Sequence, residues 1–79
     1  MKTYGLPINY KEETENGVYI FTIYYINELY YLMNINDIVT FKVGERTRTA
    51  QIYQIYYFYN YNKYYCKEVK TNDNVQRNI

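Results

Sequence analysis

The stretch Val18-Tyr-Ile-Phe-Thr-Ile-Tyr-Tyr-Ile26 decides the fold, because all nine of its residues are β-branched or aromatic. Such side chains pack well on a pleated surface and lose rotamer freedom in a helix. Both alternating sets of residues are mainly apolar or aromatic, which is typical of a central strand or of a strand whose second face meets a partner. We therefore predict a β-strand over Val18–Ile26.

Turn signals on either side of this strand predict further short strands. Upstream, Asn16-Gly17 tolerates positive φ, which favours a hairpin between a strand near Leu6–Lys11 and Val18–Ile26. Downstream, breaks rich in Asn, Asp and Gly separate runs of alternating apolar residues. These runs predict strands over Ile38–Val43, Arg46–Tyr59 and Tyr64–Val69.

The segment Leu29–Met33 fits two structures. Its aliphatic residues have helical spacing, whereas Tyr30-Tyr31 suits a strand. We favour a strand and keep a single helical turn near residues 27–34 as the alternative.

The chain is therefore predicted to be all-β, with about five short antiparallel strands in a meander and one domain over residues 1–79. Turns about ten residues apart are typical of a small barrel or a curved sheet. A change in apolar spacing predicts a β-bulge near Tyr53–Gln54, and the polar residues 70–79 are expected to fray. The candidate core residues are Tyr19, Tyr25, Ala50, Ile52, Ile55, Phe58 and one tyrosine of each Tyr-Tyr pair.

The composition argues against an enzyme. The chain has 14 tyrosines but no histidine, serine or tryptophan, which removes the usual pairs of nucleophile and base. Cys66 is expected to be a small buried hydrophobic residue rather than a nucleophile. Glu12, Glu13 and Glu15 form an acidic cluster that we interpret as a solvated loop, so we expect neither a metal nor a cofactor.

The sequence also indicates where the protein works. A lone cysteine favours a reducing compartment, and no apolar run approaches the roughly 18 residues of a membrane span. We expect a soluble cytoplasmic protein without a membrane partner. Tyr, Asn, Ile and Lys, which are encoded by A/T-rich codons, make up 39 of the 79 residues. This bias indicates a low-GC bacterial host, or a phage or mobile element within one.

The tyrosines predict a binding surface. A tyrosine offers a large rigid ring and a hydroxyl at little cost in side-chain entropy, and a Tyr-Tyr pair puts one ring on each face of a strand. We predict that a tyrosine-rich face occludes a larger protein, and a homodimer is a further option. The predicted contact residues are Tyr24, Tyr30, Tyr56, Tyr57, Tyr59, Tyr61, Arg46 and Arg48. If the larger protein handles nucleic acid, four carboxylates are predicted to mimic phosphates: Glu12, Glu13, Glu15 and Glu28.

The alternative hypothesis is a protein that binds single-stranded nucleic acid. Arg46 and Arg48 follow the predicted turn at Gly44 and share one face by the two-residue period of a strand. The tyrosines between residues 53 and 65 would supply a stacking platform beside these cations. The predicted contact residues are Lys42, Arg46, Arg48 and Lys63.

The segment Asn36-Asp-Ile-Val-Thr-Phe-Lys-Val-Gly44, followed by Arg46-Thr-Arg-Thr-Ala50, resembles the central hairpin of SH3-like small barrels. In many of these modules a Gly-Asp pair precedes a hydrophobic strand; here Asn36 stands where glycine is usual. The resemblance covers residues 36–55 and implies a small SH3-like barrel. By size, inferred origin and lack of catalytic groups, the chain is also similar to small phage-encoded inhibitors of host or defence proteins, such as anti-CRISPR proteins. That similarity implies inhibition of a larger protein by binding.

Overall fold

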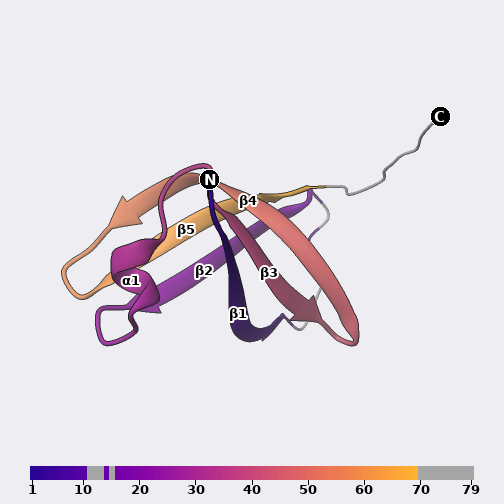
Figure 1. Ribbon diagram of the computed structural model, residues 1–79, viewed down its shortest axis with the longest axis horizontal. Coiled ribbons are helices and arrows are strands. Elements are labelled where there is room, and N and C mark those ends of the chain that lie inside the picture. The colour runs from indigo at the N-terminus through magenta and orange to yellow at the C-terminus, as the bar shows by residue number, and fades with distance from the viewer. Residues whose placement is uncertain (11–13, 15, 70–79) are drawn as a thin grey trace.

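The computed structural model describes residues 1–10, 14 and 16–69, and it confirms the all-β fold class (Figure 1). Five strands form one curled sheet, and a single helical turn is the only helix among the described residues. The elements are β1 (Thr3–Tyr10), β2 (Val18–Tyr24), α1 (Leu29–Leu32), β3 (Ile38–Val43), β4 (Arg46–Tyr57) and β5 (Tyr61–Glu68). The predicted tail over residues 70–79 lies outside the described residues.

The strand order is β1-β3-β4-β5-β2, with β1 parallel to β3 and the other pairs antiparallel. The predicted hairpin between β1 and β2 is wrong, and with it the simple meander, because these strands form the two edges of the sheet. A turn signal such as Asn16-Gly17 reverses the chain locally, but it does not choose the partner strand. β2 instead pairs with β5 from Val18 to Tyr24, where both strands bury alternate residues on one face.

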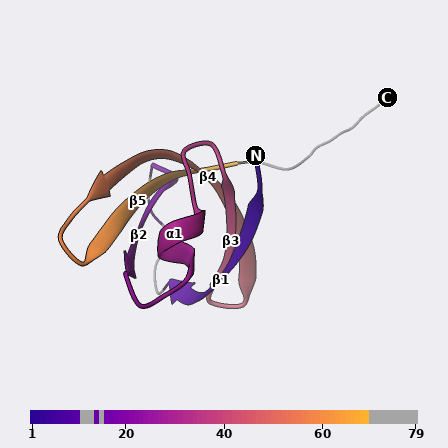
Figure 2. The same ribbon diagram turned by 60° about the vertical axis from the view of Figure 1, so that its left-hand side comes forward.

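The sheet curls into a half-barrel, and α1 lies on its open side (Figure 2). The Tyr10 hydroxyl joins the two edge strands: it donates to the carbonyl of Ile20 and accepts the Ile20 N–H at 2.8 Å. On the other side of β2, the Gly17 carbonyl accepts the Glu68 N–H of β5, and the Tyr25 N–H donates to the Asn60 carbonyl in the loop before β5. Alternate residues of an antiparallel strand bond to opposite sides, so the peptide groups of Ile20 point away from β5. This small curled half-barrel is consistent with the SH3-like fold.

The concave face of the sheet carries the hydrophobic core. Four rings, those of Tyr10, Tyr19, Phe21 and Phe41, pack with centroid separations between 4.7 and 5.8 Å. Edge-on packing of this kind is favourable beyond the area that it buries. The buried core residues are Leu6, Tyr19, Phe21, Ile23, Met33, Val39, Phe41, Val43, Ala50, Ile52, Ile55, Tyr64 and Cys66.

Two of the predicted core residues are exposed. Tyr25 is 52% exposed and Phe58 is 46% exposed, because each lies just beyond the end of a strand, where the chain leaves the sheet. The prediction of one buried and one outward ring holds best for Tyr64-Tyr65, where Tyr64 is buried. It is wrong for Tyr24-Tyr25 and Tyr56-Tyr57, in which both rings are exposed.

The segment 29–33 begins with a helical turn, so the favoured strand is wrong and the alternative is confirmed. The turn starts where the Asn27 side chain accepts the Leu29 N–H at 2.9 Å, and it ends as Met33 becomes extended and buried. Side-chain hydroxyls fasten α1 to two strands. Tyr4 of β1 donates to the carbonyl of Leu32, and Tyr64 of β5 donates to that of Tyr30.

The predicted turns and the bulge are largely confirmed. Asn36 and Gly44 have positive φ, at 80° and 64°, as a turn with Asn or Gly allows. The register of β4 against β5 shifts between Ile52 and Gln54, where the bulge was predicted. Several strand boundaries differ from the predicted ones. β1 begins at Thr3 rather than near Leu6, and β5 begins at Tyr61 rather than at Tyr64. β2 ends at Tyr24 rather than Ile26, and β4 ends at Tyr57 rather than Tyr59. Among the described residues, no helix is long and apolar enough to cross a membrane.

Candidate functional site

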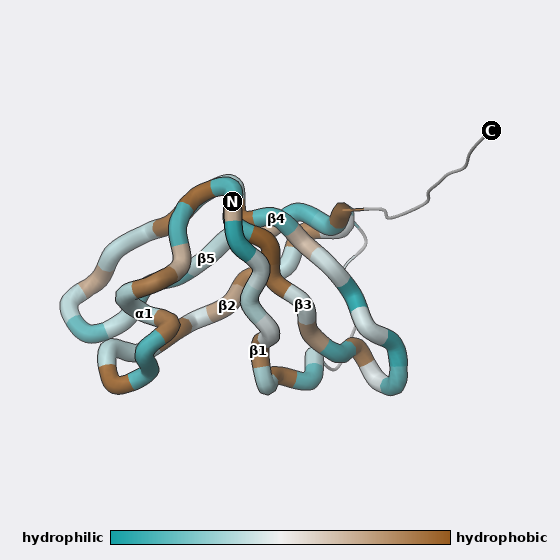
Figure 3. The backbone as a smooth tube through the Cα atoms, viewed as in Figure 1, coloured by the Kyte–Doolittle hydropathy of each residue, from teal (hydrophilic) through white to brown (hydrophobic). Residues whose placement is uncertain are grey.

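The convex face of the sheet carries exposed and half-buried aromatic rings over β2, β4 and β5. We call this surface the outer aromatic face, and its residues are Ile20, Tyr24, Tyr53, Tyr56, Phe58, Tyr61 and Tyr65. Strand alternation creates it, because residues that neighbour the buried Phe21, Ile55 and Tyr64 along the chain point the other way. Figure 3 shows β5 largely in pale and teal shades, because this strand consists of tyrosines and hydrophilic residues apart from Cys66.

Ring contacts organise the outer aromatic face into two groups. In the first, the Tyr65 ring lies 5.3 Å from that of Tyr56 and 6.4 Å from that of Tyr53, both edge-on. In the second, the Tyr61 ring stacks on Phe58 at 4.7 Å and tilts against Tyr24 at 5.6 Å. The rings therefore hold one another in place, which lowers the entropy that a partner must remove on binding.

The bulge in β4 adds a ring to this surface. Ile52 pairs with Cys66, and Gln54 pairs with the adjacent Tyr65, so Tyr53 is one extra residue on β4. Without the extra residue, the alternation that buries Ile52 would not also bury Ile55. The bulge thus keeps both isoleucines in the core and lets Tyr53 reach Tyr65 on the convex side.

The outer aromatic face is electropositive. Lys63 lies in its centre, opposite Thr22 of β2 and Tyr56 of β4. Lys67 lies opposite Val18, at the end of the face where β2 begins. The four carboxylates of the described residues lie elsewhere: Glu28 precedes α1, Asp37 is buried, Glu45 is in the β3–β4 turn, and Glu68 faces the other side beside Arg48. Rings with two lysines and no carboxylate favour a partner surface that is apolar and acidic.

The structure brings together only part of the predicted partner-binding set. Tyr24, Tyr56 and Tyr61 lie on the outer aromatic face. Tyr57 is 72% exposed, but it pairs with the buried Asn62 and so lies on the opposite side of β4. The remaining two tyrosines, Tyr30 and Tyr59, line a separate pocket.

The predicted partner-binding set omits four members of the outer aromatic face, Ile20, Tyr53, Phe58 and Tyr65, although the alternative stacking platform includes Tyr53 and Tyr65. The two-residue period from Tyr61 and Lys63 reaches Tyr65 and could have found it. Tyr53 depends on the bulge, and Phe58 was assigned to the core because it continues the apolar spacing of β4.

The predicted basic hairpin is divided between two faces of the sheet. Arg46 and Arg48 share one face, as predicted, but it is the concave face, since they pair with Val43 and Phe41. Lys42 points to the convex side. Both arginines are engaged within the molecule, and Arg48 forms an ion pair with Glu68 at 3.5 Å.

The predicted stacking platform does not adjoin this hairpin. Along β4, Thr47 opposite Lys42 and Tyr56 opposite Lys63 are nine residues apart, which is about 30 Å of extended strand. Tyr64, which belonged to the predicted platform, is buried. Of the predicted nucleic-acid contacts, only Lys63 lies among exposed rings.

Of the four predicted phosphate-mimicking acids, Glu12, Glu13 and Glu15 lie outside the described residues. Glu28 is exposed directly before α1, where its backbone carbonyl accepts the Tyr31 N–H at 3.0 Å.

Three side chains have a raised pKa, and none of them has the surroundings of a catalytic group. Burial raises the pKa of the Cys66 thiol to about 12, so the thiolate nucleophile is disfavoured. Burial also raises the pKa of Tyr10 and of Tyr64, although hydrogen bonds from Ile20 and from Asn62 oppose these increases. Within the described part of the chain, no three His, Cys, Asp or Glu side chains gather as a metal site would require.

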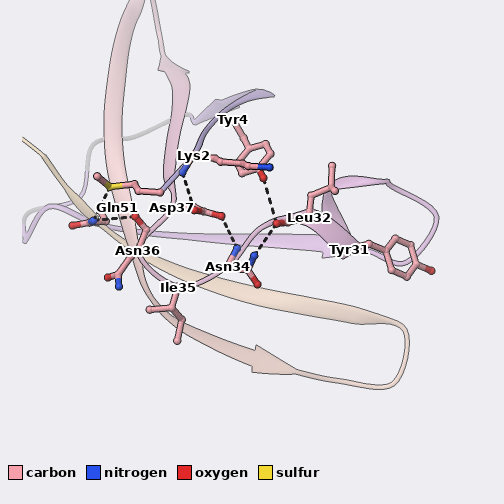
Figure 4. A pocket seen from close by; sticks show the side chains of 10 residues that line it. Lys2, Tyr4, Tyr31, Leu32, Asn34, Ile35, Asn36, Asp37 and Gln51 are labelled. Atoms are coloured by element: carbon pink, nitrogen blue, oxygen red, sulfur yellow. Dashed lines mark hydrogen bonds between the residues drawn. The ribbon is translucent and has the colours of Figure 1, made fainter.

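A pocket of about 680 Å³ lies between the N-terminus, α1 and the loop before β3 (Figure 4). Its carboxylate, Asp37, accepts the backbone N–H groups of Lys2 at 3.0 Å and of Asn34 at 2.9 Å. Gln51 donates to the carbonyl of Asn36 at 3.0 Å. These bonds tie the N-terminus to the loop before β3, and we assign the pocket a structural role.

Comparisons of the chain with protein-family models, with curated proteins and with solved structures give no match.

Proposed function

We propose that this protein is a non-enzymatic binding protein that occludes a larger protein through the outer aromatic face. The observation that carries the proposal is the mutual packing of half-exposed rings around Lys63 on one sheet face. Interfaces are enriched in such rings as binding hot spots, and an ordinary surface avoids exposing them together.

The partner in this proposal is a host or defence protein, and the gene belongs to a phage or mobile element of a low-GC bacterium. The A/T-biased composition supports that origin, and the resemblance in type to anti-CRISPR proteins supports inhibition as the outcome. If that partner is a nucleic-acid-handling enzyme, Glu12, Glu13, Glu15 and Glu28 are the proposed phosphate mimics.

Affinity capture from lysate of a low-GC host, with and without nuclease, tests the proposal. The bait variant combines Tyr56→Ala and Tyr65→Ala on the outer aromatic face; the matched control, Tyr57→Ala, removes an exposed ring from the opposite side of β4. We expect the wild type and the control to retain one stoichiometric, nuclease-resistant protein that the double variant loses. Equal retention by the double variant would refute the assignment of this face.

Single-stranded nucleic-acid binding is the second candidate, and one observation favours it: Lys63 and Lys67 lie on a face with rings and without carboxylates. Exposed rings stack on bases and the lysines would contact phosphates. In this second candidate function, the nucleic acid binds to the outer aromatic face rather than to the β3–β4 hairpin.

Fluorescence anisotropy with a labelled oligothymidine at several salt concentrations separates the two candidates. Nucleic-acid binding should weaken steeply with salt and should be lost with Lys63→Glu and Lys67→Glu together. Arg46→Glu should leave this binding nearly unchanged. Absence of salt-sensitive binding would remove the second candidate and leave the first.

A further inference from the structure

Four tyrosines from three separate segments converge on one pocket beside the outer aromatic face. The pocket has a volume of about 560 Å³ and is lined by Tyr25, Tyr30, Tyr31, Tyr59 and Asn60. Tyr25 follows β2, Tyr30 and Tyr31 belong to α1, and the other two lie in the β4–β5 loop. We call it the tyrosine pocket.

Backbone hydrogen bonds hold these segments together. The Tyr25 N–H donates to the Asn60 carbonyl at 3.0 Å, which joins the end of β2 to the β4–β5 loop. The Tyr30 carbonyl accepts the Tyr64 hydroxyl at 3.4 Å and the Asn62 amide at 3.5 Å, which joins α1 to β5. The tyrosine pocket is therefore built by tertiary structure, because the β4–β5 loop is distant along the chain from Tyr25 and α1.

The electrostatics of the tyrosine pocket suit a cation. The face of each ring carries the negative part of its quadrupole, and none of the five lining residues is a lysine or an arginine. Glu28 supplies a carboxylate on the turn that leads into α1: it precedes Tyr31 by three residues, and its backbone carbonyl accepts the Tyr31 N–H. Among the described residues, no salt bridge occupies the Glu28 carboxylate.

The lining also selects the kind of cation. A bare ammonium is strongly hydrated, and its burial requires hydrogen-bond acceptors or a carboxylate in contact. The lining offers rings and one amide but no carboxylate. A quaternary ammonium has no N–H to satisfy, is weakly hydrated, and is the usual ligand of aromatic cages.

From this geometry we propose that the tyrosine pocket binds a trimethylammonium group, as carried by choline or by a trimethylated lysine. The site is separate from the outer aromatic face, so it stands whether or not that face occludes a protein.

Titration with choline, followed by two-dimensional ¹H–¹⁵N NMR of the full chain, tests the proposal. The control ligand is 3,3-dimethylbutan-1-ol, which has the shape of choline with carbon in place of the charged nitrogen. We expect saturable shifts at the lining residues with a Kd on the order of 1–10 mM for choline, and affinity at least about 5-fold weaker for the neutral ligand. Equal affinities would show a merely apolar hollow and would overturn the proposal, as would the lack of any saturable shift.

Variants locate the binding. Tyr31 and Tyr59 are 70% and 100% exposed, so Tyr31→Leu and Tyr59→Leu should fold normally. Each should weaken choline binding about 2- to 5-fold, whereas Tyr59→Phe should retain it. Tyr53→Leu removes a comparable ring outside the pocket and should have no effect; an equal loss there would contradict the site.

Nε-trimethyllysine, titrated in a second arm, identifies the source of the group. Tighter binding of trimethyllysine than of choline would assign a methylated protein side chain, and the reverse order would assign a small molecule. If neither ligand binds at concentrations on the order of 100 mM, the proposal fails while the proposed function of the outer aromatic face is untouched.

Discussion

Removal of the Tyr10 hydroxyl should weaken the contact between β1 and β2, the two edge strands of the sheet. The Tyr10 hydroxyl serves both the N–H and the carbonyl of Ile20, and no backbone pairing links β1 to β2. Tyr10→Phe deletes these two hydrogen bonds and leaves the ring against Tyr19, Phe21 and Phe41. The substitution therefore isolates the polar contact from the packing.

The expected magnitude follows from the number of bonds and their exposure. Two hydrogen bonds at about 0.5–1.5 kcal/mol each set an upper range of about 1–3 kcal/mol. Water can reach this edge and replace part of the loss, so we expect the free energy of unfolding to fall by about 1 kcal/mol. Urea denaturation measures it, with Tyr53→Phe as the control, because the described residues show no hydrogen bond to that hydroxyl.

Hydrogen exchange gives a residue-specific readout of the same prediction. The Ile20 N–H points away from β5, so its protection from exchange depends on Tyr10 and should be lost in Tyr10→Phe. The Tyr19 amide faces β5 and should stay protected in both proteins. If the Ile20 amide remains protected in the variant, or if the urea midpoint moves no more than in Tyr53→Phe, the Tyr10 hydroxyl does not hold the two edge strands together.

Three further predictions test the turn, the core and the buried thiol. Asn36 has a φ of 80°, so Asn36→Gly should leave stability equal or slightly higher, whereas Asn36→Ala should lower it by about 1 kcal/mol in urea denaturation. Ile52 is fully buried, and Ile52→Ala should cost about 2–5 kcal/mol; the control Ile20→Ala, at a 42% exposed position, should cost far less, and similar losses would contradict the assigned core. Burial raises the pKa of Cys66 from 9.0 to about 12, so the thiol ionises first in the unfolded chain. Its contribution to stability is complete below pH 9 and falls at about 1.4 kcal/mol per pH unit between pH 9 and 12. Stability measured against pH should be flatter above pH 9 in Cys66→Ala, and an unchanged slope would place the thiol in water.

Local sequence patterns determined most of the secondary structure of this protein; the exception is Leu29–Leu32, whose pattern fits both a strand and a helical turn. Alternation over Val18–Tyr24 and Ile38–Val43 specified strands, and the changed spacing near Tyr53 specified the bulge. The abundance of tyrosine also indicated a surface suited to binding, because a small core cannot hold so many rings. These properties depend on neighbouring residues and on composition, which a sequence displays directly.

Tertiary structure alone decided which strands pair and which rings meet. A turn signal at Asn16-Gly17 cannot reveal that β2 pairs with β5 rather than with β1, since pairing depends on buried faces from distant segments. The same topology turns Arg46 and Arg48 to the concave side, away from Lys42 and from the outer aromatic face. It also gathers Tyr25, Tyr31 and Tyr59 into one pocket. Long-range packing creates each of these sites, and for that reason local pattern does not predict them.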